Sequence, residues 1–246
     1  MMIFPLFAAA VAVVSVCQAA SDAATSAREA AQQYGAAVRN CDMSWAVDSM
    51  YPPLRRTYAD QLTSRTREAE IARARRVQGL ERETVVQARA RMAANDKALR
   101  AKYTRMGEEM KQRGITVESY TVGNATAEYV VTPPMATVAQ VRKDTAGRVR
   151  AEQIGSTQER SRVVILPTTL VVSAPAADGR RTRMERRSFI YAVRDEVITD
   201  KSQPRGTVLN KWYFIDGNTD VNTLRTFFPN LPLYLKLPGT GDRILP

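Results

Sequence analysis

Two β-rich segments, Arg162–Ser173 (RVVILPTTLVVS) and Arg181–Arg194 (RTRMERRSFIYAVR), decide the fold of this chain. Both contain many β-branched or aromatic residues, and the turn pair Asp178-Gly179 lies between them, which is typical of a long antiparallel hairpin. Pro167 interrupts the first segment. Because proline cannot donate a ladder hydrogen bond, it predicts an edge strand or a bulge there. The sequence therefore predicts an antiparallel sheet around this hairpin.

Further strands are expected on both sides of the hairpin. They are predicted at Ile115–Val122, Glu128–Val131, Thr137–Val141, Arg148–Ile154 and Lys211–Asp216. In the last of these, side chains alternate across the strand, so Trp212 and Phe214 share one face while Tyr213 and Ile215 share the other. Val221–Phe228 is predicted as a short helix, and the proline-spaced residues after it as an extended tail.

The N-terminal part has the composition of helices. Residues 22–40 are rich in alanine and contain no proline, so we expect a first helix there, with Ala30, Tyr34 and Val38 on one face. Asp42 or Ser44 is expected to cap a short second helix. Tyr51-Pro52-Pro53 should end it, because a residue before proline is disfavoured in the helical region.

The stretch from Asp60 to Arg113 contains no proline and is dominated by Ala, Arg, Glu, Lys and Gln. This composition predicts one long helix or a helix hairpin, with Gly79 and Asn95-Asp96 as candidate breaks. A seam of residues at alternating steps of three and four resembles a coiled coil. It consists of Val77, Leu80, Thr84, Ala88, Met92, Asn95, Leu99, Tyr103, Met106 and Met110.

Helices followed by strands are the order expected of an α+β fold. We predict a single domain over residues 21–246, in which helices of residues 21–113 pack on a curved antiparallel sheet formed mainly by residues 114–246. The helical part is rich in Arg and Ala.

Residues 1–20 are predicted to be an export signal. Met1–Ala20 is an apolar run that ends in small residues, and Ser21 is expected to begin the mature chain. No Lys or Arg precedes the run, so an uncleaved membrane anchor is the alternative. We expect an exported protein, periplasmic or secreted, with no transmembrane span after cleavage. Removal of Cys17 would leave Cys41 alone, and we interpret Cys41 as a buried, reduced thiol.

The composition excludes several kinds of chemistry. There is no histidine in the chain, which rules out a His-based triad and the commonest metal ligand. The sequence also lacks a Gly-rich phosphate loop, a CxxC pair and a metal-spaced cluster. We therefore predict no catalytic residue, no metal ligand and no cofactor.

The net charge of +11 is shared between both halves of the chain and includes many arginines. Such a surface attracts anionic partners, although a merely solvated face is the common alternative. Arg73, Arg75 and Arg76 are our candidate residues for an anionic partner, such as an anionic polymer of the cell envelope. Nucleic acid is the least expected partner, because an export signal is predicted and the sequence has no recognised nucleic-acid motif.

Four parts of the chain resemble uncharacterised exported bacterial members of the nuclear-transport-factor-two-like superfamily, which has a cystatin-like cone fold. The resemblance rests on Cys41–Leu54, Arg113–Gly123, Ile165–Val172, and Lys211–Gly217 with Phe228–Pro238. It implies a curved sheet around a cone-shaped pocket. In the isomerases of this superfamily a Tyr and an Asp do the chemistry. No motif here places them at matching positions, so no catalytic residue is carried over. The helical region and Thr132–Glu159 depart from the pattern.

Aromatic residues are the candidates for lining such a pocket. We predict ligand-binding roles for Trp45, Tyr51, Tyr191 and Tyr213, with ordinary core packing as the alternative. The leading hypothesis is an exported, non-catalytic module that binds a small apolar ligand or a protein partner. One alternative is a small cone-pocket enzyme of the isomerase or cyclase type. Another is a cell-envelope assembly or adhesion protein that uses its basic helices.

Overall fold

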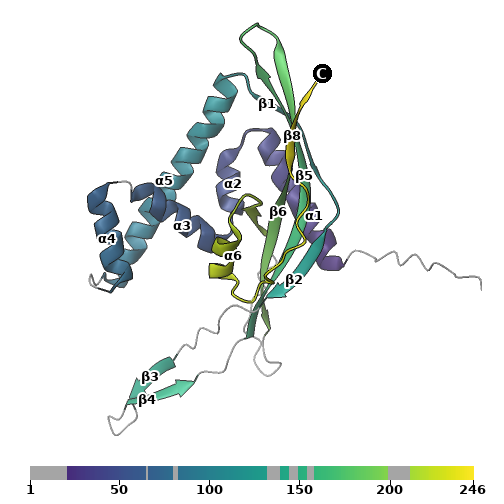
Figure 1. Cartoon of the computed structure of the whole chain (residues 1–246). Coiled ribbons are helices and arrows are strands. Elements are labelled where there is room, and N and C mark those ends of the chain that lie inside the picture. Colours follow the sequence, from purple (N-terminus) through teal and green to yellow (C-terminus); the bar gives the residue numbers. More distant parts are fainter. Residues whose placement is uncertain are drawn as a thin grey trace, which may run out of the picture.

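The chain folds as helices packed on a curved antiparallel sheet, which confirms the predicted α+β class (Figure 1). The computed structural model describes residues 21–64, 66–79, 83–131, 139–143, 149–153, 158–198 and 211–246. The predicted signal at residues 1–20 lies outside them. The helices are α1 (Asp22–Arg39), α2 (Met43–Ser49), α3 (Pro52–Thr63), α4 (Arg67–Val77), α5 (Val85–Gln112) and α6 (Val221–Phe227).

The strands are β1 (Thr116–Val122), β2 (Ala127–Val131), β3 (Ala139–Lys143), β4 (Val149–Gln153), β5 (Gln158–Pro175), β6 (Arg181–Ile198), β7 (Tyr213–Asp216) and β8 (Gly241–Leu245). The long hairpin is confirmed, since β5 and β6 pair in continuous register and Gly179 takes a positive φ of 80° in the turn. β1 and β2 both pair with the far side of β5, while β7 and β8 both pair with β6. β3 and β4 form a separate pair. The sequence did not predict β8.

Pro167 lies in a central strand, so the prediction of an edge strand or a bulge at this position is wrong. β5 has β6 on one side and β1 and β2 on the other. The register of β1 on β5 ends at Thr168, and that of β2 begins at Ile165. Pro167 lies at the gap between β1 and β2, where its carbonyl oxygen accepts the Gly123 N–H at 2.9 Å. The proline nitrogen, which carries no hydrogen, faces the same gap, so no ladder hydrogen bond is lost there.

The helix boundaries follow local capping chemistry. The Asp42 side chain caps α2, as predicted, by accepting the backbone N–H of Trp45. The helix after α2 begins at Pro52, whereas the sequence predicted helical structure only from Asp60 onwards. Pro52 and Pro53 occupy the first turn of α3, where a proline costs no hydrogen bond. The break at Gly79 is confirmed by its positive φ of 69°. The break at Asn95-Asp96 is wrong, since α5 continues through both residues.

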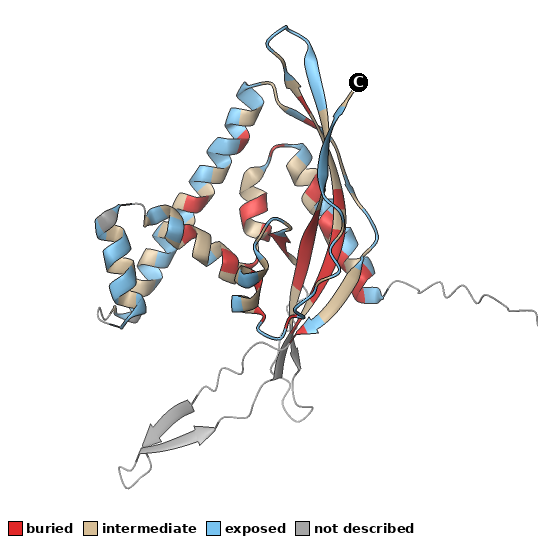
Figure 2. Cartoon of the chain, viewed as in Figure 1, coloured by how far each residue is buried: buried red, intermediate tan, exposed pale blue. Residues whose placement is uncertain are grey.

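Helices cover both faces of the sheet, and the buried residues gather along β5 and β6 (Figure 2). On one face the alanines of α1 pack against Val164, Leu166, Ile190 and Ala192. On the other, Leu54 of α3 and Leu224 of α6 pack with the aromatic residues of β6. The predicted alternation in β7 is confirmed: Phe214, with the preceding Trp212, belongs to the first cluster and Ile215 to the second. Small alanines let α1 lie close to the sheet.

The predicted helical seam is buried only in part. Leu99 is 2 % exposed, whereas Val77 is 81 % exposed. A coiled coil at this seam stays a prediction. Cys41 is a buried free thiol, as expected. Within the described ranges, no helix combines the length and apolar character that a membrane crossing requires.

Candidate functional site

The helices and the edge of the sheet surround a partly open cavity of about 430 Å³, which we call the α2–α5 cavity. The lining side chains come from α1, α2, α3 and α5, and from β6, β7 and the turn after β7. The lining residues are Tyr34, Met43, Ala46, Met50, Leu54, Tyr58, Tyr103, Met106, Ile190, Phe214, Ile215, Asp216, Asn218 and Thr219. Its size is that of sites for small ligands, which span about 300–1,000 Å³.

A glycine brings α5 close enough to α2 to shape this cavity. Gly107 is buried, and a Cβ at this position would overlap the carbonyl oxygen of Cys41. Cys41 itself has a positive φ of 52°, in the turn between α1 and α2. The close approach of the two backbones places Tyr103 and Met106 of α5 against the cavity.

An ion-pair network ties α2, α3 and α5 together behind the cavity. The Arg55 guanidinium donates two hydrogen bonds to the Asp96 carboxylate, at 2.5 and 2.6 Å. Arg100 donates to Asp48 at 2.7 Å and to Asp96 at 3.2 Å. The hydrogen bond from Arg55 lowers the pKa of Asp96 from its ordinary value of 3.8. Bidentate arginine–carboxylate pairs fix geometry, so this network holds the cavity wall in place.

The cavity contains hydroxyl groups that have no partner in the part of the chain that the structure describes. Among the described residues, no hydrogen bond reaches the phenol oxygens of Tyr34, Tyr58 or Tyr103, or the buried Oγ1 of Thr219. Burial raises the pKa of Tyr34 to about 12, and the Asp216 charge and Tyr103 add to the shift. Burial likewise raises the pKa of Tyr103. The phenols of Tyr34 and Tyr103 are therefore neutral hydrogen-bond donors at physiological pH.

Asp216 supplies the one carboxylate among the lining residues. It is exposed, at the C-terminal end of β7, and its Oδ1 accepts the backbone N–H of Asn218 at 2.7 Å. The turn after it is close-packed, because a Cβ at Gly217 would overlap the carbonyl oxygen of Phe189. The carboxylate is thus held on a rigid turn near the phenols whose pKa values it raises.

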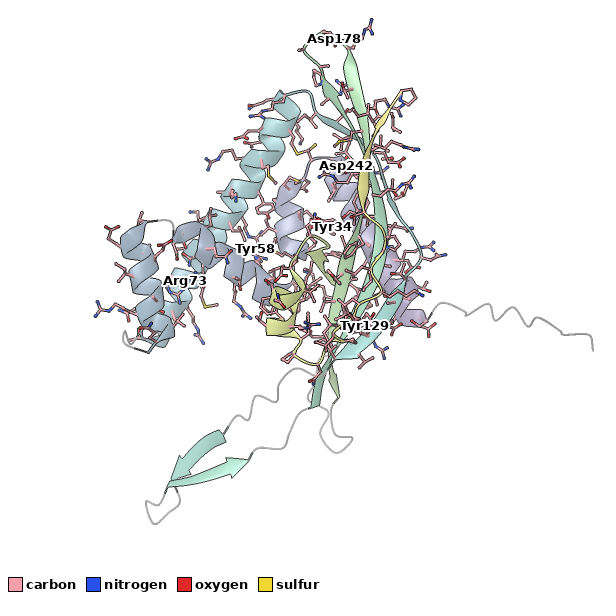
Figure 3. All side chains as sticks on the ribbon, in the orientation of Figure 1. Tyr34, Tyr58, Arg73, Tyr129, Asp178 and Asp242 are labelled. Atoms are coloured by element: carbon pink, nitrogen blue, oxygen red, sulfur yellow. The ribbon has the colours of Figure 1, made fainter. Side chains whose placement is uncertain are left out.

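Apolar and aromatic side chains form the rest of the wall. Three methionines line the cavity, and such flexible, polarisable side chains adapt to ligands of differing shape. Tyr34 is fixed by its ring contacts, with centroids 5.1 Å from Phe214 and 5.8 Å from Trp45. Figure 3 labels Tyr34, which belongs to α1, and Tyr58, which belongs to α3. The arrangement suits an apolar ligand with a hydrogen-bond acceptor.

The aromatic residues predicted as ligand contacts lie around the cavity rather than on its lining. Tyr51 and Tyr191 are buried in the cluster that also contains Leu54 of α3 and Leu224 of α6. Tyr213 packs against Tyr51, with ring centroids 6.4 Å apart. Trp45 contacts Tyr34. The structure thus brings three of the four together on one face, and their role as ligand contacts stays a prediction.

The residues that do line the cavity were only partly visible in the sequence. Tyr34 and Tyr103 were recognised as members of apolar helix faces, whereas Tyr58 and Asp216 carried no functional signal. The missed signal is the position of the tyrosines in space: they come from three different helices and line one cavity, which only the packing of the helices reveals.

The three predicted arginines lie on α4, away from this cavity. Arg73 and Arg76 line a second hollow, and Arg75 is exposed. The part of the chain that the structure describes contains no group of three or more residues able to hold a metal ion. Comparison with family models, curated proteins and solved structures found no match to this chain.

Proposed function

We propose that the chain is an exported binding protein whose α2–α5 cavity takes a small apolar ligand carrying a carbonyl or other hydrogen-bond acceptor. One observation carries the proposal: Tyr34, Tyr58, Tyr103 and Thr219 line an otherwise largely apolar cavity, and their hydroxyls have no hydrogen-bond partner among the described residues. The Oγ1 of Thr219 is the buried atom of this set, and because buried polar groups are normally hydrogen-bonded, its lack of a partner favours a ligand or water that pairs with it.

A pair of probes of nearly equal shape tests this function. 2-Acetylnaphthalene carries a carbonyl acceptor, and 2-ethylnaphthalene does not. We expect the ketone to bind about 5- to 10-fold more tightly, because a net hydrogen bond is worth about 1 kcal/mol. Replacing Tyr34 and Tyr103 together by Phe should remove the preference, as measured by calorimetry or ligand-induced fluorescence change.

Two further variants separate the cavity from nonspecific binding. Met106→Trp should weaken both probes, because the larger side chain fills part of the cavity. Tyr234→Phe is the matched control, because Tyr234 is 92 % exposed on the tail and should leave both affinities unchanged. Equal affinity for the two probes in the native chain, or no effect of Met106→Trp, would contradict the proposal.

An isomerase-type enzyme is the second candidate, and Asp216 is the observation that favours it. A carboxylate beside neutral phenols could take a proton from the carbon next to a carbonyl, while a phenol donates to the enolate oxygen. In D₂O this would exchange the methyl protons of 2-acetylnaphthalene for deuterium. Exchange that is lost in Asp216→Asn, with binding retained, would identify an enzyme. Binding without exchange would identify a non-catalytic module.

A further inference from the structure

A second hollow, of about 550 Å³, lies between the C-terminal end of α3, the length of α4 and the N-terminal half of α5. We call it the α4 hollow. Figure 3 shows Arg73 on α4, well apart from Tyr34. The lining residues are Asp60, Thr63, Ser64, Ala69, Ala72, Arg73, Arg76, Val77, Arg91 and Asn95. None of them lines the α2–α5 cavity.

Positive charge dominates this lining. Three guanidinium groups face one carboxylate, that of Asp60. Asp60 is already occupied, because it accepts from Arg91 at 3.2 Å and from the Asn95 amide at 2.7 Å. Arg91 is also compensated, since it donates to Glu83 at 3.0 Å. Arg73 and Arg76 are therefore the arginines of the lining that no carboxylate of the described residues holds in an ion pair.

Arg73 and Arg76 are three residues apart, so both project from one side of α4 into the hollow. Each is half-buried, and neither makes a hydrogen bond or ion pair with any residue that the structure describes. The Arg76 charge is nevertheless close enough to Glu83 to help Arg91 lower the pKa of that carboxyl. Two like charges held near each other and partly out of water favour an anion that neutralises them.

The helix that carries these arginines contributes little to the core. None of the α4 side chains that the structure describes is buried. A short helix with so little packing is marginally stable alone, so an anion that joins α4 to α3 and α5 would add to its stability. Guanidinium groups pair bidentately with carboxylate and phosphate, and a hollow of this volume admits a small molecule with two such groups.

We propose that the α4 hollow is a binding site for a small multivalent oxyanion, carboxylate or phosphate, held by Arg73 and Arg76. The site is independent of the α2–α5 cavity. Arg91, fixed by Asp60 and Glu83, forms its wall. Arg75, exposed on the same helix, is not part of it.

Calorimetric titration with pyrophosphate and with citrate, at constant ionic strength, tests the site. The test variant replaces Arg73 and Arg76 by Gln. The matched control replaces Arg75 and Arg89, both exposed and outside the hollow, and so changes the net charge equally. We expect saturable one-to-one binding of at least one anion, weakened about tenfold or more in the test variant and less than about twofold in the control.

The two anions distinguish the source of the ligand: preference for pyrophosphate indicates a phosphorylated molecule, and preference for citrate indicates a polycarboxylate. Either preference supports the site. Equal weakening in both variants would overturn it, because binding would then follow overall surface charge. Absence of binding for both probes would overturn it as well. Circular dichroism of the test variant verifies folding, and Tyr34→Phe should leave anion affinity unchanged.

Discussion

At the scale of single residues, burial of phenols defines the candidate site and can be titrated. Burial raises the pKa of Tyr34 to about 12, from an ordinary value of 10.0. The folded state thus holds the phenol proton more tightly than the unfolded state. The resulting stability is complete below pH 10 and is lost as pH rises towards 12. We expect Tyr34→Phe to reduce the tyrosinate absorbance step near pH 12.

The exposed Tyr234 provides the control for this titration, since Tyr234→Phe should leave the step near pH 12 intact. Tyr191, whose pKa burial also raises to about 12, should account for part of the remaining amplitude. An unchanged amplitude at pH 12 in Tyr34→Phe would mean that Tyr34 is not buried beside Asp216.

Ketone binding should be constant between pH 6 and 9, because the donor phenol stays neutral throughout.

At the scale of elements, the ion pairs of Arg55 and Arg100 connect α5 to α2 and α3. Their hydrogen bonds lower the pKa of Asp96, so this carboxylate stabilises the fold above its ordinary pKa of 3.8, and the contribution disappears as pH falls through the lower folded value. Asp96→Asn should cost about 1–2 kcal/mol at pH 7, after allowance for partial exposure. The difference should shrink towards pH 2 in denaturant titrations.

Asp178→Asn is the control at this scale, because Asp178 lies on the exposed turn of the β5–β6 hairpin and its nitrogen–oxygen distance to Arg180 is 3.9 Å. It should change the free energy of unfolding by less than about 0.5 kcal/mol. If Asp96→Asn changed the free energy of unfolding at pH 7 by as little as Asp178→Asn does, the ion pairs of Asp96 would not be stabilising the packing of α5.

The elements themselves could largely be predicted from the sequence, because hairpins and helices are specified by local pattern and turn chemistry. The β5–β6 hairpin and the alternation of Trp212 and Phe214 follow from such patterns. Pro167 was misread because its tolerance depends on where two other strands begin and end. The cavity could not be predicted either, since it depends on the approach of α5 permitted by Gly107 and on tyrosines from three separate helices.

At the scale of the whole molecule, the predicted cleavage after Ala20 can be set against the capping of the first helix. The Ser21 side chain caps α1 by accepting the Ala24 N–H at 3.1 Å, and the helix begins at Asp22. Cleavage after Ala20 would keep this cap, whereas cleavage two residues later would lose it at a cost of about 1 kcal/mol. We therefore predict that N-terminal sequencing of the exported protein reads Ser-Asp-Ala-Ala, from Ser21 onwards. Ala20→Arg should block cleavage, because the signal peptidase requires a small residue there. Recovery of the native chain with Met1 intact in a membrane fraction would instead indicate an anchor.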